Sequence, residues 1–247
     1  MNPLVGIGLK LASTIVFTVM SAIVKVAAQS YPTGQIVFFR SFFAIAPLIV
    51  WMAWRGDLRG IARTSRPLAH LRRSVAGSAA MFCGFAALAT LPLATATAIG
   101  YATPLLTTAL AAFLLQEVVL PHRWGAVTAG FGGMLVMVGP ALAASLTGAQ
   151  GHLDPVGILF GLAGAGCAGL ASIEVRRLAQ QEPTGVIVFY FLMTASTLGL
   201  ATAVTGWRMP SPTEFGMLVT AGILGGIGQI LLTSSYRFAP ASVIAPF

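Results

Sequence analysis

Eight long stretches of apolar residues constrain the fold of this chain more than any other feature of its sequence. Most of them are 18 to 25 residues long, close to the ~20 residues that a helix needs to cross the hydrocarbon core of a bilayer. Only 8% of the 247 residues are charged, too few to cover the surface of a soluble domain. The stretches also lack the alternating pattern of porin strands, so the sequence predicts an all-α polytopic membrane protein. The predicted spans are residues 4–28, 33–54, 74–91, 94–115, 124–142, 155–175, 184–204 and 213–235, and a ninth begins near residue 239.

The basic residues indicate how these spans are oriented. The connection between the second and third predicted spans contains six arginines and one acidic residue. Because Lys and Arg accumulate in cytoplasmic loops, this loop and, by alternation, the N-terminus are predicted to face the cytoplasm, with the chain in a bacterial inner membrane. The same sorting accounts for the net charge of +8, so no nucleic-acid partner is expected. The six arginines are Arg55, Arg59, Arg63, Arg66, Arg72 and Arg73.

The two halves of the chain resemble each other when one is shifted by 151 residues. Residues 5–38 and 156–189 share 15 identities in 34 positions without a gap, including the segment PTGxIVF. Five predicted crossings separate the two starting points, and because five is odd, the halves must be inserted with opposite orientations. The sequence therefore predicts two inverted five-helix repeats, residues 1–142 and 155–247, the second of them incomplete. A complete second repeat would give ten helices and about 293 residues, and the alternative is a naturally shorter fold of eight spans.

Several local motifs carry a resemblance to a known transporter family. They are Phe38-Phe39-Arg40 in the second span, Pro104 in the fourth, Gln116-Glu117 at its end, and Ala239-Pro240-Ala241-Ser242 at the start of the ninth. Together with the repeats, they resemble the drug/metabolite transporter superfamily of the EamA type. The segments GIGLKLASTIVFTVMSAIVK and QIVFFRSFFAIAP look most like its branch of riboflavin and S-adenosylmethionine carriers. The sequence departs from the family in stopping before the C-terminal helices that complete the central cavity.

The resemblance implies transport of a small molecule across the lipid bilayer by alternating access. Riboflavin uptake is the leading prediction, and S-adenosylmethionine or amino-acid-metabolite transport, as import or export, is the alternative. A homodimer and a non-transporting membrane partner protein stay open as further alternatives. No nucleophile–base pair falls inside a span, so an enzyme is not expected.

Polar residues inside the predicted spans are the candidates for substrate binding, because ionisable groups in hydrocarbon are costly. Arg40 lies about seven residues into the second span, where a guanidinium needs an oxygen partner, although it could also be a structural arginine between helices. Glu174 lies near a span end beside two arginines, and no acid lies near the middle of any predicted span, which disfavours a cationic drug and favours a neutral or weakly anionic solute. The predicted substrate-binding residues are Ser21, Lys25, Arg40, Thr97, Tyr101, Ser172, Tyr190 and Gln229, with Thr233 as a further cavity candidate.

Most of these residues also have a purely structural interpretation. Ser21 and Ser172 are related by the repeat, as a pseudo-symmetric site would require, but serine also bonds the backbone of its own helix. Lys25 could extend its amine toward the membrane surface, and Tyr101 and Tyr190 could be aromatic residues of the membrane interface. These alternatives stay open at the level of the sequence.

The remaining patterns indicate packing rather than chemistry. Residues 164–169 match the G-x-G-x-x-G of dinucleotide sites, but they fall in the middle of an apolar span with no strand before them. Small residues four apart, such as Gly222 and Gly226, are interpreted as points of close helix contact. The three histidines fall in separate predicted loops, so neither a metal site nor a cofactor is predicted.

Overall fold

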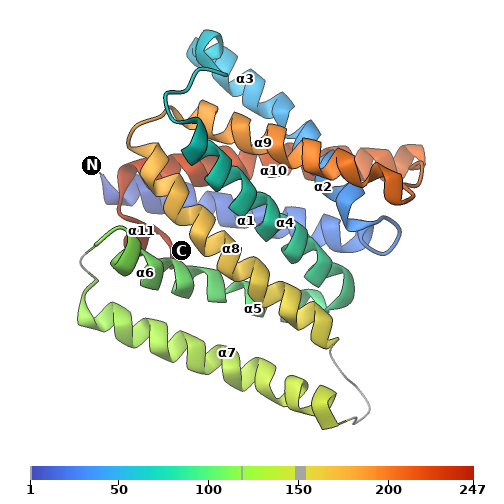
Figure 1. Cartoon of the computed structure of the whole chain (residues 1–247), viewed down its shortest axis with the longest axis vertical. Helices are drawn as coiled ribbons and strands as arrows, with labels where there is room; N and C mark the ends of the chain where they lie inside the picture. Colours follow the sequence, from blue (N-terminus) through green and yellow to red (C-terminus); the bar gives the residue numbers. More distant parts are fainter. Residues whose placement is uncertain (1, 118, 148–153) are drawn as a thin grey trace.

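The computed structural model describes residues 2–117, 119–147 and 154–247, and these residues form a bundle of helices (Figure 1). The helices cross the molecule from side to side in Figure 1, α1 and α10 close to horizontally and α4 and α8 obliquely. We call the end that holds the C-terminus of the first helix the Lys25 end and the opposite end the Arg176 end. In chain order the α-helices are α1 (Pro3–Ala27), α2 (Thr33–Phe43), α3 (Ile45–Arg55), α4 (Pro67–Thr90), α5 (Leu93–Gly100), α6 (Ala102–Leu114), α7 (Pro121–Thr147), α8 (Pro155–Ala179), α9 (Thr184–Ala201), α10 (Pro212–Phe238) and α11 (Ala241–Ile244), with short 3-10 segments η1 (Leu58–Gly60) and η2 (Thr202–Thr205).

Three of the long helices begin at a proline that follows a capping residue. The Asn2 side chain accepts a hydrogen bond from the backbone N–H of Leu4 at the start of α1 (3.2 Å). Asp154 caps α8 in the same way, and Ser211 and Glu214 form a capping box on α10. These side chains bond N–H groups that a helix start leaves free, and proline is suited to the first helical position. The dipeptides NP, DP and SP therefore fix where the three helices begin.

Two of the predicted spans are broken in the middle. The second breaks at Ala44, between α2 and α3, and the fourth breaks at Tyr101, between α5 and α6. Each break lies three residues before a proline, Pro47 or Pro104. Proline has no N–H and its ring clashes with the carbonyl four residues earlier, so a helix bends or ends at this point.

The lengths and compositions of the helices are those of a polytopic membrane protein. Within the described residues, six helices or broken helix pairs are long and apolar enough to cross a membrane, and a shorter apolar helix covers Trp124–Pro140. The third predicted span corresponds to α4, which begins at Pro67, seven residues earlier than expected, and so includes charged side chains in its first turns. The helix α11 begins at Ala241, close to the predicted start of the ninth span.

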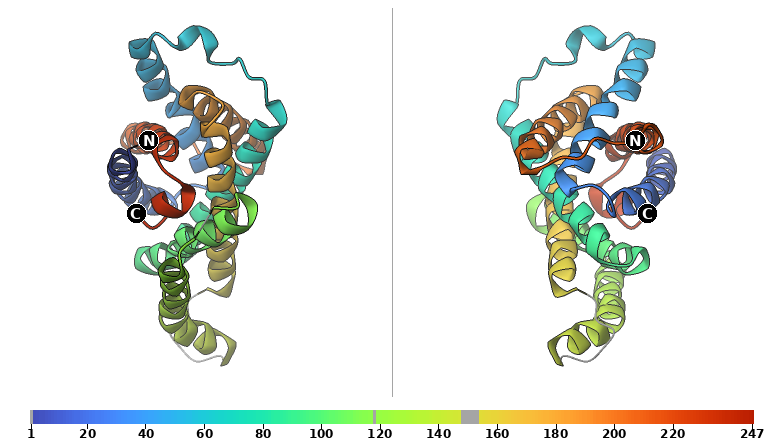
Figure 2. Two further views of the ribbon diagram at one scale, coloured as in Figure 1. Left: turned by 90° about the vertical axis from the view of Figure 1, so that its left-hand side faces the viewer. Right: turned by 90° about the vertical axis from the view of Figure 1, so that its right-hand side faces the viewer.

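The long helices pack in pairs, and each pair takes one helix from each half of the chain. The helix α1 lies along α10, α8 lies along α4, and α2 packs against α9 (Figure 1). The main core of the bundle contains Val24, Leu48, Val188 and Leu192, which are fully buried. The helix α7 packs against α5 and α6 at the edge of the bundle (Figure 2).

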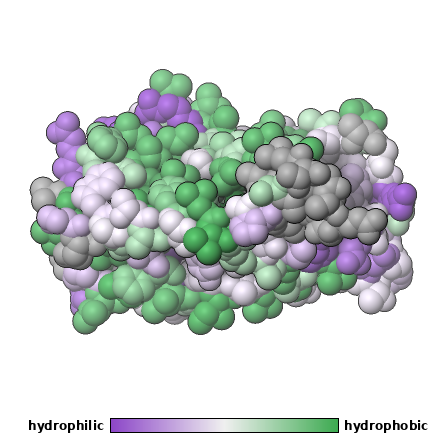
Figure 3. Space-filling model, turned by 90° about the horizontal axis from the view of Figure 1, so that it is seen from below, coloured by the Kyte–Doolittle hydropathy of each residue, from purple (hydrophilic) through white to green (hydrophobic). Residues whose placement is uncertain are grey.

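The outer surface of the bundle suits a lipid environment. Large aliphatic side chains such as Val50 and Leu159 point outward, with 69% and 67% of their surface exposed. In the view of Figure 3, apolar residues cover much of the middle of the face and most of the hydrophilic residues lie toward the two ends. This distribution is expected for a bundle whose middle faces hydrocarbon and whose ends face water.

Candidate substrate-binding site

Two arginines from different helices lie against one aromatic ring inside the bundle. Arg40 of α2 is 4% exposed and Arg73 of α4 is 3% exposed. Their guanidinium carbons lie 5.8 Å and 4.0 Å from the centre of the Phe191 ring on α9. Arg40 also donates a long hydrogen bond from Nη2 to the backbone oxygen of Gly225 on α10 (3.4 Å). Four helices therefore meet around these two charges.

A buried amide lies on the same face of α10. Gln229 is 4% exposed, and its Nε2 donates to the hydroxyl of Thr233 one turn further along (3.3 Å). It follows by one turn the Gly225 carbonyl that accepts from Arg40. Other buried polar side chains on α2, α4 and α9 are Ser41, Ser74, Ser78 and Ser196.

Lys25 bonds a helix end. Its Nζ donates to the backbone oxygens of Leu88 and Leu91, both at 2.7 Å, at the C-terminus of α4. The last carbonyls of a helix have no partner within the helix and carry the negative end of its dipole, so an amine stabilises them. Ser21, one turn before Lys25, is half-buried on α1.

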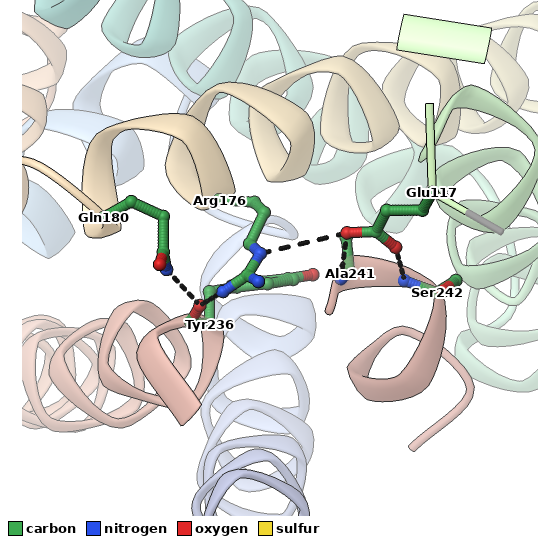
Figure 4. Close-up of polar contacts among 6 residues, drawn as sticks. All are labelled: Glu117, Arg176, Gln180, Tyr236, Ala241 and Ser242. Atoms are coloured by element: carbon green, nitrogen blue, oxygen red, sulfur yellow. Dashed lines mark hydrogen bonds and ion pairs between the residues drawn. The ribbon is translucent and has the colours of Figure 1, made fainter. Parts of the chain in front are cut away.

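At the opposite end, Arg176 and Glu117 connect three helices (Figure 4). Arg176 donates from Nη1 to the backbone oxygen of Tyr236 near the C-terminus of α10 (2.6 Å), and its Nε lies 3.8 Å from Glu117 Oε1. The Glu117 carboxylate accepts hydrogen bonds from the backbone N–H groups of Ala241 and Ser242, both at 2.9 Å. The Gln-Glu and Ala-Pro-Ala-Ser motifs, which lie far apart in the sequence, are thus in direct contact.

The Ser172 hydroxyl forms a hydrogen bond within its own helix. Its hydroxyl donates to the backbone oxygen of Ala168 (2.9 Å), and it lies within hydrogen-bonding reach of the Tyr236 hydroxyl. This geometry matches the structural interpretation of the serine given above.

Tyr190 lies at the Arg176 end. Its hydroxyl donates to the backbone oxygen of Ala62 in the connection between α3 and α4 (2.9 Å), and its ring packs on the buried His70 at 4.7 Å between centroids. Tyr190 therefore ties α9 to this connection.

Further polar contacts close each end of the bundle. At the Arg176 end, the buried Glu182 accepts hydrogen bonds from the hydroxyls of Thr64 (2.8 Å) and Ser65 (3.3 Å). At the Lys25 end, the buried Gln35 donates to the backbone oxygen of Arg208 (2.6 Å) and accepts from its backbone N–H (3.1 Å). Each contact joins the start of α2 or α9 to a connection on the other half of the chain.

Thr97 and Tyr101 lie apart from the arginines. The Thr97 hydroxyl donates to the backbone oxygen of Leu93 in its own helix (2.7 Å). Tyr101 is 66% exposed and lines an apolar groove of ≈ 390 Å³ formed by α5, α6, α7 and Ser242. The predicted binding residues thus do not form one site, and Arg40 and Gln229 are the two that lie in the buried polar region of α2 and α10.

Arg73 is the residue that the sequence prediction misplaced. The run of arginines before it predicts a loop position, but Arg73 is buried inside α4, because that helix begins at Pro67. Proline at a helix start and Gly77 one turn after Arg73 are the signals that could have placed it in the interior. Among the described residues, no three His, Cys, Asp or Glu side chains lie close enough to hold a metal ion.

The family of the chain follows from comparison with known proteins. The EamA-like transporter family matches residues 4–139, which is more than half of the chain. The chain belongs to the EamA-like transporter family. This confirms the superfamily that the sequence motifs predicted.

Curated EamA-type relatives align over nearly the whole chain. A pseudopaline exporter from Pseudomonas aeruginosa is 30% identical over 241 residues, which are 97% of this chain and 81% of the relative. An S-adenosylmethionine uptake transporter from Rickettsia bellii is 27% identical and covers 98% of this chain and 80% of its own length. A solved crystal structure with 22% identity has a TM-score of 0.75 and covers 98% of this chain and 84% of that chain, so the two share a fold.

The family and the apolar helices together indicate a multi-pass membrane transporter. The names of the two relatives describe the movement of small molecules, in one case outward and in the other inward. Neither name refers to riboflavin, so the riboflavin prediction gains no support from them.

Proposed function

We propose that the chain is a secondary transporter of the bacterial inner membrane that moves a small amino-acid-derived metabolite, with S-adenosylmethionine as the leading candidate. Transport would proceed by alternating access of two inverted repeats, residues 1–142 and 155–247. The Arg176 end would face the cytoplasm, which is supported by the exposed arginines that gather there. They are Arg55, Arg59, Arg63, Arg66 and Arg72.

The observation that carries this proposal is a pair of equivalent contacts at opposite ends of the bundle. Lys25 and Arg176 are 151 residues apart, the spacing of the sequence repeat. Lys25 ends α1 and bonds the C-terminal carbonyls of α4, and Arg176 ends α8 and bonds a C-terminal carbonyl of α10. Because α4 and α10 are the third spans of their halves, the same contact occurs twice with opposite orientation. Inverted repeats predict this arrangement.

The helix pairing supports the same layout. The first span of each half packs along the third span of the other, α1 with α10 and α8 with α4. The second spans, α2 and α9, pack against each other. A pseudo-twofold axis in the membrane plane would exchange the first two pairs and return the third to itself.

The contacts that close the two ends would act as gates. Opening the Arg176 end requires loss of the Glu182 hydrogen bonds to Thr64 and Ser65, and opening the Lys25 end requires loss of the contacts between Gln35 and Arg208. Each gate is a small set of hydrogen bonds, so either one can open without unfolding the helices it joins.

The substrate class is supported by the relatives and by the chemistry of the interior. S-adenosylmethionine combines a purine, a sulfonium, a carboxylate and an amine. The purine and the sulfonium suit an aromatic ring, the carboxylate suits guanidinium groups, and the amine suits the oxygen of a buried amide. Phe191, the two buried arginines and Gln229 supply these groups. Export of an amino-acid-derived metabolite, as the name of the pseudopaline exporter suggests for that relative, is the second candidate direction.

Counterflow in liposomes tests the proposal without knowledge of the coupling ion or the direction. The purified full chain is reconstituted into vesicles loaded with unlabelled S-adenosylmethionine, and entry of labelled S-adenosylmethionine is followed. We expect transient accumulation that protein-free vesicles and unloaded vesicles do not show, and that external riboflavin does not compete with. Exchange of riboflavin instead, or of neither compound, would refute the proposed substrate.

A further inference from the structure

Within the described residues, no carboxylate pairs with the two buried arginines. The chain has six acidic residues, and all of them are described and have other partners. Asp57, Glu117 and Glu174 pair with other arginines, Glu182 bonds a neighbouring connection, and Asp154 and Glu214 cap helices. Two like charges therefore share one interior with no carboxylate beside them.

Both guanidinium groups also have unused donors. In the described structure, Nε and Nη1 of Arg40 and Nε and Nη1 of Arg73 are buried without a hydrogen-bond partner. Leaving buried donors on a charged group unpaired is costly, and a buried charge is normally paired or bound to a ligand. The donors are therefore better explained by a ligand than by packing.

Two glycines provide the space in which these groups lie. A Cβ at Gly225 would lie 2.6 Å from Arg40 Nε, and a Cβ at Gly77 would collide with Arg73 Nη1 and lie 2.9 Å from a Phe191 ring carbon. Because both residues are glycines, α10 and α4 leave room for the guanidinium groups of Arg40 and Arg73.

We infer that Arg40 and Arg73 together bind the carboxylate of the transported solute, beside the Phe191 ring that both guanidinium groups contact. A guanidinium presents its donors as a planar fork that matches the two oxygens of a carboxylate. The pair lies among α2, α4, α9 and α10, where a headgroup from the surrounding bilayer does not reach, so the anion belongs to the solute. This inference rests on the proposed transport function and adds to it the group that is recognised.

The sharpest test compares two substrates that differ in the carboxylate alone. Decarboxylated S-adenosylmethionine keeps the purine, the sulfonium and the amine. In competition for counterflow, we expect the wild-type chain to prefer S-adenosylmethionine by tenfold to hundredfold, because hydrogen bonds to charged groups have about this effect on affinity. Arg40→Gln and Arg73→Gln should reduce this preference to about twofold. Arg72→Gln, an exposed neighbour on the same helix, should keep it.

A second measurement keeps the inference testable if S-adenosylmethionine is not a substrate. The thermal unfolding midpoints of the purified chain and its variants are measured with millimolar citrate, L-glutamate or inorganic phosphate. We expect a carboxylate to raise the midpoint of the wild type and of Arg72→Gln, but not of Arg40→Gln or Arg73→Gln. Stabilisation by phosphate alone, or by no anion, would overturn the assignment, as would variants that respond like the wild type.

The ligand-free stability of the variants separates binding from structure. If the arginines exist to bind an anion, Arg73→Met should unfold at the same temperature as the wild type or higher, because it removes an unpaired buried charge. Arg73→Lys should retain part of the carboxylate preference, since it keeps the charge but loses the fork. If Arg73→Met and Arg73→Lys both fail to fold, the arginine is a structural element and the inference is wrong.

Discussion

Replacing Gly226 with alanine tests a close contact between helices of the bundle. Gly226 of α10 faces the break between α2 and α3, and a Cβ there would lie 2.6 Å from the backbone oxygen of Ala44 and 2.6 Å from a ring carbon of Pro47. Ordinary contact begins at 3.4 Å, so α10 would have to move away from a backbone that proline already constrains.

The magnitude follows from two opposing terms. Alanine favours a helix over glycine by about 0.5–1 kcal/mol, whereas overpacking of a well-packed interior costs about 1–3 kcal/mol. We therefore expect a net loss of about 1–2 kcal/mol. Gly166→Ala in α8 is the matched control, because a Cβ at Gly166 would meet nothing within 4 Å. Gly166→Ala should therefore gain only about 0.5–1 kcal/mol, the amount by which alanine favours a helix over glycine.

The assay is reversible unfolding of the purified variants in mixed micelles with increasing SDS, followed by circular dichroism. The unfolding midpoint of Gly226→Ala should be lower than that of the wild type, and that of Gly166→Ala should be equal or higher. Equal midpoints for Gly226→Ala and Gly166→Ala would refute the argument that the glycine permits close approach of the helices.

Three further substitutions test the polar contacts. Glu182→Ala removes an acceptor of charge-assisted hydrogen bonds worth about 1.5–3 kcal/mol, so the Arg176 end should open more often. A cysteine that replaces the buried Val186, in a background without native cysteines, should then react at least tenfold faster with a water-soluble maleimide. An unchanged rate would exclude a gate there. Lys25→Met leaves two helix-end carbonyls without their amine and should lower stability by about 1–3 kcal/mol in SDS titration, and no loss would mean that the amine is replaceable by water. Glu117→Gln should speed hydrogen exchange of the Ala241 amide about tenfold, a result that would not occur if α11 were held by packing alone.

The sequence predicted the parts of the structure that depend on local rules. Apolar length located the spans, and the small-residue spacing at Gly222 and Gly226 correctly indicated close contacts, now seen against Phe43 and Ala44. These features could be predicted because a bilayer imposes one length and one polarity on every crossing.

The features that the sequence did not predict depend on contacts between segments that are distant in the chain. Arg73 appeared to belong to a basic loop, and only the position of Phe191 across the bundle shows that it is interior. For Tyr101 the sequence left both a cavity position and a membrane-interface position open, and the side chain lines the exposed apolar groove beside α7. Neither outcome follows from apolarity or helical spacing, because both depend on how α4 and α5 rotate about their axes when they pack.

The two proposed gates differ in the partners that they use. The Glu182 carboxylate accepts hydrogen bonds from the hydroxyl side chains of Thr64 and Ser65, whereas the Gln35 amide both donates to and accepts from the backbone of Arg208. The first contact therefore depends on which side chains stand at positions 64 and 65, and the second does not depend on the side chain at position 208. Substitutions in the connection at the Arg176 end can thus change one closed form of the molecule without changing the other.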